Sequence, residues 1–186
     1  MGTHKQNCRI IADVLHHHGV RHIVCSPGSR NAPMLLAVDS LPKVETHIVI
    51  DERSAAFVAL GLAQISREPV ALVCTSGTAL LNYAPAVAEA YYQGLPLIVI
   101  SADRPERWID QDDSQTLRQP GALSNFVKKS YDIHDFAADN VDMCRYANRE
   151  VNDAMITALR RRRGPVARGH GRHPLRHQGR EAGALL

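Results

Sequence analysis

The chain has 186 residues, of which 45% are hydrophobic, and a formal net charge of +3. This length suits about one domain, and the apolar content is sufficient for a buried core. No apolar run approaches the ~20 residues that cross a bilayer, and the N-terminus has no apolar signal core, so we expect a cytoplasmic protein without a membrane partner.

Short apolar strands alternate with helices along the first hundred residues. Such strands, which lack polar alternation, must be covered on both faces. The pattern therefore predicts an α/β fold with a doubly wound, mostly parallel sheet and helices on both faces. The predicted helices span residues 7–18, 31–38, 52–66 and 76–92, and the predicted strands span residues 22–25, 47–50, 69–74 and 96–101.

The regular pattern stops after the fourth strand. Residues 102–124 are polar and rich in Arg, Asp and Gln, and a loop of this length is typically functional or disordered. Residues 128–133 are then expected to form one more strand, and residues 141–163 the last helix. Residues 164–166 look like the start of a further strand, but we expect no strand to follow.

In an open parallel sheet, ligands bind beyond the carboxyl ends of the strands, and four predicted loops leave such ends here. The first loop, residues 26–30, has Gly28 for a tight turn and Ser29 as a candidate helix cap. Arg30 could clamp a carboxylate through two hydrogen bonds. An ordinary strand–turn–helix connection explains this segment equally well.

The second loop places Glu52 at the corner between a strand and a helix, with small residues behind it. In a cleft with little water its charged form would be disfavoured, and it would become a usable acid or base. The alternative is that Asp51 and Glu52 only complement the dipole of the helix that follows.

The third loop, residues 75–79, is a turn of small residues that leads into a helix. Such a turn lets a flat ring or an anion approach the backbone closely. It lacks the lysine of a P-loop, so we do not expect it to bind a nucleoside triphosphate.

The fourth loop begins with Asp103 and Arg104 directly after a strand. It continues to Gln115 and Arg118, which together with the neighbouring Gln119 add donors and no carboxylates. Arginines from two loops would favour a substrate with more than one carboxylate. The alternative is a solvated loop in which Asp103 and Arg104 pair with each other.

Five motifs in one order carry a resemblance to a known family. In this order and spacing the chain resembles the MenD family, the 2-succinyl-5-enolpyruvyl-6-hydroxy-3-cyclohexene-1-carboxylate synthases, which depend on thiamine diphosphate. The resemblance covers residues 7–166 and implies that residues 1–166 form a pyrimidine-binding domain. The motifs are SPGSR at residues 26–30, DERSA at 51–55, TSGTA at 75–79, ADRP at 102–105 and QTLRQPG at 115–121.

The resemblance also implies roles for single residues. Glu52 matches the glutamate that contacts N1′ of the cofactor's aminopyrimidine, and is expected to be both catalytic and cofactor-binding. Pro27 and Thr78 are expected beside the cofactor. The cofactor carries the chemistry, and the protein supplies position and electrostatics. Positions around the substrate are matched by Ser29, Arg30, Arg104 and Gln115.

Enzymes of this family decarboxylate 2-oxoglutarate and add the succinic semialdehyde carbanion to isochorismate, in menaquinone biosynthesis. Both substrates are dicarboxylates, which agrees with the arginines at the strand ends. The resemblance implies a homo-oligomer with its active site between subunits, and no nucleic acid partner. Two alternatives stay open: another thiamine diphosphate carboligase or decarboxylase, and a non-catalytic α/β module that binds a carboxylate.

The chain departs from the family in length and in its last segment. The central and diphosphate-binding domains are absent, with the Gly-Asp-Gly…Asn run that holds Mg²⁺, so we expect an inactive fragment with no metal site of its own. Residues 160–186 hold eight arginines and one acid. Residues 167–186 are expected to be a basic tail that is disordered or read out of frame. A nucleic-acid-binding arm is the rival interpretation, although this tail has no aromatic residues for stacking.

Overall fold

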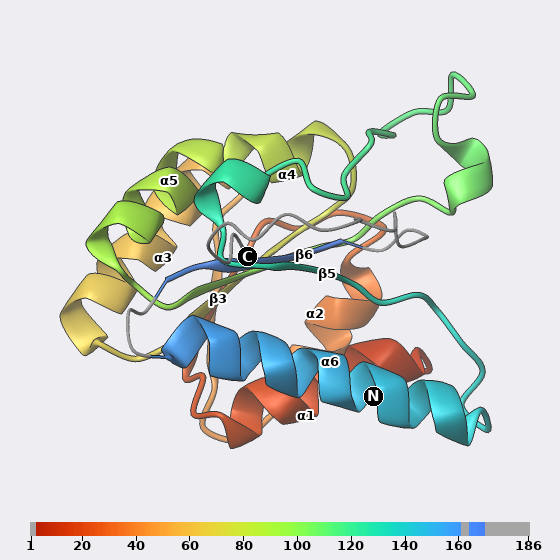
Figure 1. The fold of residues 1–186 in the computed structure, drawn as a ribbon, viewed down its shortest axis with the longest axis horizontal. Coiled ribbons are helices and arrows are strands. Elements are labelled where there is room, and N and C mark those ends of the chain that lie inside the picture. The colour runs from red at the N-terminus through yellow and green to blue at the C-terminus, as the bar shows by residue number, and fades with distance from the viewer. Residues whose placement is uncertain (1–2, 161–163, 170–186) are drawn as a thin grey trace, which may run out of the picture.

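The computed structural model describes residues 3–160 and 164–169, which form a six-stranded sheet between two layers of helices (Figure 1). The strands are β1 (His22–Cys25), β2 (Glu45–Ile48), β3 (Val70–Cys74), β4 (Leu97–Ser101), β5 (Ser130–Asp132) and β6 (Val166–Gly169). The helices are α1 (Gln6–His17), α2 (Ala32–Asp39), α3 (Glu52–Ser66), α4 (Thr78–Asn82), α5 (Ala84–Gln93) and α6 (Val141–Leu159), with single 3-10 turns η1 (Glu106–Trp108) and η2 (Ser124–Phe126).

The strands lie in the order β2-β1-β3-β4-β6-β5, and every neighbouring pair is parallel. The predicted α/β class with a doubly wound parallel sheet is therefore confirmed. Among the described residues, no helix is both long and apolar enough to cross a membrane.

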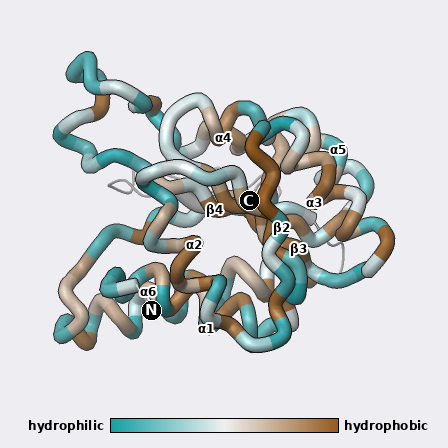
Figure 2. The backbone as a smooth tube through the Cα atoms, turned by 180° about the vertical axis from the view of Figure 1, so that it is seen from behind, coloured by the Kyte–Doolittle hydropathy of each residue, from teal (hydrophilic) through white to brown (hydrophobic). Residues whose placement is uncertain are grey.

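The sheet separates two hydrophobic cores. One core joins the sheet to α1, α2 and α6, and the other joins it to α3, α4 and α5. Strands β3 and β4 are buried at every position, and each large apolar side chain buried there contributes about 1.5–3 kcal/mol. Figure 2 shows that the loop after β4, by contrast, projects from the body as a mainly hydrophilic segment.

The bounds of most predicted elements differ by one or two residues in the structure, and two of the differences have a clear physical reason. The helix predicted over residues 76–92 is divided into α4 and α5 at Tyr83, because Pro85 in the first turn of α5 has no N–H for a continuous helix. Strand β2 begins two residues before its predicted start, since its register with β1 pairs His22 with Glu45 and Cys25 with Ile48.

The expectation that no strand follows residues 164–166 is wrong. Strand β6 continues to Gly169 between β4 and β5. Backbone hydrogen bonds join the start of this strand to the segment before β5. The N–H of Lys128 donates to the carbonyl of Pro165 at 2.9 Å, and the N–H of Ala167 donates to the carbonyl of Lys129 at 3.1 Å. Backbone groups make this strand, so the polar sequence after Val166 did not reveal it.

The end of the chain is only partly described. Helix α6 ends at Leu159, and residues 161–163, which complete the predicted helix, lie outside the described residues. Most of the predicted basic tail, residues 170–186, also lies outside them, so its predicted disorder and its out-of-frame origin stay predictions.

Candidate functional site

The turn after β1 is held by Asn31. Its Oδ1 accepts a hydrogen bond from the N–H of Gly28 at 2.8 Å, and its Nδ2 donates to the carbonyl of Ser26 at 2.8 Å. Asn31 is buried and is the N-cap residue of α2, whereas Ser29 is exposed. The predicted cap at Ser29 is therefore wrong, because the longer amide side chain bridges the turn from inside.

The first and third loops touch at Gly28. A Cβ atom added there would lie 2.6 Å from Cβ of Thr75, which is closer than real side chains approach. Ser26 also links the first loop to the second, because its Oγ donates to the carbonyl of Val49 at 2.9 Å. The structure thus brings the first three predicted loops together at the carboxyl edge of the sheet.

The adjacent acids Asp51 and Glu52 occupy different environments. Asp51 is exposed and caps α3, accepting a hydrogen bond from the N–H of Ser54 at 2.7 Å, and this bond lowers the pKa of its carboxyl. Glu52 is half-buried. Burial raises the pKa of the Cys74 thiol, and the nearby charge of Glu52 raises it further. Glu52 is therefore near enough to Cys74, the last residue of β3, for its charge to act on that thiol, while Asp51 takes the capping role.

The third loop is packed directly against the fourth. Gly77 has φ of +81°, and a Cβ atom there would lie 3.0 Å from the carbonyl carbon of Gln115. Ser76 Oγ donates to the same carbonyl group at 2.9 Å. Thr78 is exposed at the start of α4. Within the described part of the chain, the buried Oγ1 of Thr75 has no hydrogen-bond partner, and a bound polar group could satisfy it.

Gln119 is a positioning residue whose importance the sequence did not reveal. Its Oε1 accepts from the N–H of Gly77 at 2.7 Å, and its Nε2 donates to Ser101 Oγ at 3.1 Å and to the carbonyl of Ala102 at 2.9 Å. Its side chain is buried and joins the end of β4 to the third loop. A polar residue in a polar loop gave no signal of this burial.

The predicted substrate residues from the first and fourth loops meet. Arg30 Nη1 donates to Gln115 Oε1 at 2.9 Å. Arg104 is paired with Asp113, and both side chains are largely buried. The fourth loop thus brings the carboxylate of Asp113 to its own Arg104. Asp103 contacts Arg104 through the backbone, where Oδ1 accepts from the N–H at 2.7 Å.

Two other charged residues of this loop, Arg118 and Asp103, lie in different environments. Arg118 Nε donates to Asp110 Oδ2 at 2.7 Å in an exposed pair, so it does not join the other arginines. Burial raises the pKa of Asp103 to about 7, although the hydrogen bond from the N–H of Arg104 opposes this shift and the charge of Asp132 adds to it. Asp103 can therefore hold a proton at neutral pH.

An open cavity of about 820 Å³ lies beside Arg30 and Arg104. Of the residues predicted around the substrate, Arg30 and Arg104 line this cavity, whereas Ser29 and Gln115 do not. The residues predicted around the cofactor, Pro27, Glu52 and Thr78, do not line it either. Its charged lining residues are mixed in sign, with Lys5, Arg30, Arg104 and Arg107 against Asp103, Glu106 and Asp135.

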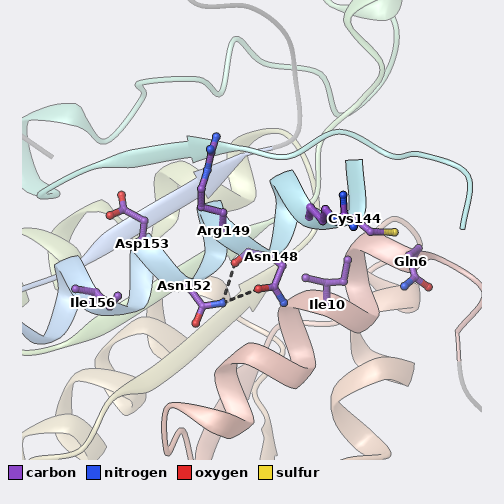
Figure 3. A pocket seen from close by; sticks show the side chains of 9 residues that line it. Gln6, Ile10, Cys144, Asn148, Arg149, Asn152, Asp153 and Ile156 are labelled. Carbon is purple, nitrogen blue, oxygen red and sulfur yellow. Dashed lines mark hydrogen bonds between the residues drawn. The ribbon is translucent and has the colours of Figure 1, made fainter. Parts of the chain in front are cut away.

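A second hollow, of about 740 Å³, lies over α1 and α6. Figure 3 shows that its side chains, among them Ile10, Asn148 and Asn152, come from the outer side of α6 and the start of α1. Asn152 bonds within its own helix, its Nδ2 donating to the carbonyl of Asn148 at 2.9 Å. None of the predicted site residues lines this hollow, so it is not the candidate site.

Comparison with known proteins agrees with the geometry. Residues 7–122 match the family model described as thiamine pyrophosphate enzyme, N-terminal TPP binding domain. The 2-succinyl-5-enolpyruvyl-6-hydroxy-3-cyclohexene-1-carboxylate synthase of Porphyromonas gingivalis is 52% identical over 162 residues, which cover 87% of this chain and 28% of that protein.

Two further synthases of the same name give similar values. The protein of Desulfotalea psychrophila is 51% identical over 159 residues, covering 84% of this chain and 29% of its own. The protein of Bacteroides fragilis is 47% identical over 166 residues, which cover 89% of this chain and 30% of that protein. The chain spans less than a third of the length of these relatives. The resemblance found in the five motifs is confirmed, and the chain belongs to the thiamine pyrophosphate enzyme family, matching its N-terminal TPP-binding domain.

Proposed function

We propose that this chain is the pyrimidine-binding domain of a synthase that decarboxylates 2-oxoglutarate and joins the remaining four-carbon unit to isochorismate, in menaquinone biosynthesis. The observation that carries the proposal is the half-buried place of Glu52 at the start of α3, near the end of β3. Its charge is felt by Cys74 at the end of β3, and Asp51 has already satisfied the capping requirement of α3. Glu52 is thus available for a ligand at the sheet edge.

The residues at this edge fit thiamine diphosphate. When bound, this cofactor supplies a carbon nucleophile and then stabilises the charge left by decarboxylation. Glu52 would share a proton with N1′ of its aminopyrimidine, with Pro27 and Thr78 beside it. The buried Oγ1 of Thr75, without a hydrogen-bond partner among the described residues, supports a polar ligand here. Gly77, with its positive φ, lets the third loop turn without a side chain in the way.

The carboxylates of the substrates would be bound by Arg30 and Arg104, with Ser29 and Gln115 beside them. The hydrogen bond between Arg30 and Gln115 supports one shared binding region. Asp113 is the ion-pair partner of Arg104. A substrate carboxylate would therefore exchange with Asp113 and would not meet a bare cation.

The proposal includes a homo-oligomer with the active site between subunits, in the cytoplasm, where small polar metabolites are available. Mg²⁺ would be bound by a diphosphate-binding domain outside this chain. An apolar surface close to Glu52 supports a protein contact: Ile48, Ile50, Phe57 and Val58 are exposed to between 41% and 82%. Exposed apolar side chains are typical of interaction sites where they gather on one surface.

The decisive experiment uses a chimaera in which residues 1–166 replace the matching part of the Porphyromonas gingivalis relative. In this protein, Glu52→Gln should lower kcat at least about 100-fold, because a positioned proton donor or acceptor contributes about 10²–10⁴-fold. Asp51→Asn is the matched control. It should keep kcat within about twofold, since asparagine caps a helix as well as aspartate. Equal losses in the two variants would remove Glu52 from the mechanism.

Substrate choice is tested in the same chimaera. Arg104→Ala should raise KM for 2-oxoglutarate about tenfold or more while leaving half-saturation by thiamine diphosphate unchanged, because a charged hydrogen bond contributes about 1.5–3 kcal/mol. Equal use of pyruvate and 2-oxoglutarate would favour another carboligase. Cofactor and carboxylate binding without turnover would favour a non-catalytic module.

A further inference from the structure

Three metal-ligating side chains meet at the opposite end of β1 from the candidate site. His22 lies in β1, and Glu45 and His47 lie in β2. His22 Nδ1 is 3.2 Å from His47 Nε2 and 3.6 Å from Glu45 Oε2, and His47 Nε2 is 3.8 Å from Glu45 Oε1. One ligand atom from each residue lies within 4.8 Å of the other two, so a single ion can contact all three.

The parallel pairing of two strands builds this cluster. The register pairs His22 with Glu45 and Val24 with His47, and alternate residues of a strand share one face. The backbone N–H of Glu45 donates to the carbonyl of Arg21 at 2.8 Å, which fixes the start of the pairing. The ligand positions are therefore set by the sheet and not by a loop.

The spacing of the three side chains suits zinc. A tetrahedral zinc ion holds nitrogen and oxygen ligands at about 2.0–2.2 Å, which places neighbouring ligand atoms about 3.4 Å apart. The two ring nitrogens are 3.2 Å apart, and the two oxygens of Glu45 lie 3.6 Å from the nitrogen of His22 and 3.8 Å from that of His47, so all three distances are near this value. Two imidazoles and one carboxylate also form a known zinc ligand set, which leaves the fourth position for water. Mg²⁺ prefers six oxygen ligands and would not choose these rings.

We propose that His22, Glu45 and His47 bind a zinc ion, separate from any Mg²⁺ that accompanies the cofactor. The ion can enter from solvent, because the two imidazoles are 25% exposed and Glu45 is 68% exposed. In the part of the chain that the structure describes, strand β2 lies at the edge of the sheet and pairs with β1 alone. A zinc ion joining the two strands would anchor β2, which leads directly to the corner that bears Glu52.

The sequence alone predicted no metal site in this chain. His22 is separated from Glu45 and His47 by an entire helix, so no short ligand motif appears. Only the register between β1 and β2 brings the rings together.

The test is zinc titration of the metal-free 186-residue chain by calorimetry. We expect a one-to-one site, and each of His22→Gln, His47→Gln and Glu45→Gln should weaken it at least about 10- to 100-fold, since even indirect partners of a metal contribute that much. The matched control is a double substitution, His16→Gln with His17→Gln, in the last turn of α1. It should keep the affinity of this site within twofold.

A second measurement does not depend on heats of binding. Zinc at about 100 times Kd should raise Tm of the parent chain by about 5 °C or more, and Glu45→Gln should abolish most of this rise. Because Glu45 is largely exposed, Glu45→Gln should leave the fold intact. The two histidines are more buried, and their substitution could also lower the stability of the fold. Mg²⁺ at the same concentration should leave Tm unchanged through this site.

Two results would overturn the proposal. Zinc binding that survives the substitutions in β1 and β2 but disappears in the α1 control would place the site elsewhere. Absence of stoichiometric zinc binding by the parent chain would leave His22 and His47 as a hydrogen-bonded ring pair with Glu45 beside it.

Discussion

The two segments that close over the candidate site are held in different ways. Residues 75–82 are fixed from inside, where the N–H of Gly77 and the hydroxyl of Ser76 bond to the loop that covers them. Residues 106–118 end in an exposed ion pair, with Arg118 81% and Asp110 54% exposed. Exposed pairs contribute about 0–1 kcal/mol, whereas an unsatisfied buried group costs about 1–3 kcal/mol. The inner bonds therefore contribute more to the shape of the site than the exposed ion pair at the outer end of this loop.

The largest difference in stability is expected between substitutions of Gln119, which makes the inner bonds, and of its sequence neighbour Arg118, which makes the exposed pair. Gln119→Ala removes three buried hydrogen bonds, and should lower the free energy of unfolding by about 3 kcal/mol. Arg118→Ala should change it by no more than about 0.5 kcal/mol. Urea unfolding of both variants measures the difference, and similar losses would show that the outer loop is as important as the inner bonds.

A smaller effect is expected at the glycine of the third loop. Gly77→Ala forces a side chain into a left-handed conformation and against the backbone of Gln115, which should cost about 1–2 kcal/mol. Gly61→Ala is the control, because Gly61 lies inside α3 with no atom within 4 Å of the added Cβ. It should stabilise the protein by up to about 1 kcal/mol. A thermal scan that ranks Gly77→Ala above the parent chain would contradict the close contact.

The smallest effect concerns pH and Asp103, which lies between the two segments. Its carboxyl has a pKa of about 7 when folded, against 3.8 without the fold. Between these values the folded state binds a proton that the unfolded state has lost, so this group makes stability fall as pH rises from about 4 to 7.

Asp103→Asn removes that dependence. Relative to the parent chain, the variant should gain about 1 kcal/mol at pH 8, a value reduced for solvent screening of a partly exposed group. Its stability relative to the parent should not change with pH below about 4. Urea midpoints at pH 4, 6 and 8 provide the comparison, and parallel curves for both proteins would refute the assignment.

The sheet and its site loops could be predicted because their signals are local. The apolar runs of β3 and β4 are buried at every position, and each short turn after a strand carries its own motif. The sequence could not predict that Asp51 caps α3 while Glu52 is half-buried. Two adjacent acids look equivalent in a sequence, and only the folded start of the helix gives them different surroundings. Gln119 was missed for a similar reason: its partners lie in β4 and in the third loop, and no periodicity marks an amide that becomes buried.

Two other features depend on contacts between distant segments. The pairing of Arg104 with Asp113 requires the fold of the loop that joins them, which no motif specifies. Strand β6 is only four residues long and ends in Arg168 and Gly169, which show no strand pattern. Backbone pairing with β4 and β5 makes these residues a strand. Hydrophobic patterns in a sequence indicate which side chains are buried. They therefore do not predict a strand that is defined mainly by its backbone hydrogen bonds.

Strand β6 is the last described strand in the chain, yet it lies between β4 and β5. A polypeptide is synthesised from its N-terminus, so β5 and α6 leave the ribosome before the strand that attaches β5 to the sheet. Until β6 arrives, β4 presents an unpaired edge that another chain could occupy. The order of synthesis therefore leaves the edges of β4 and β5 without their shared neighbour until residues 166–169 insert between them.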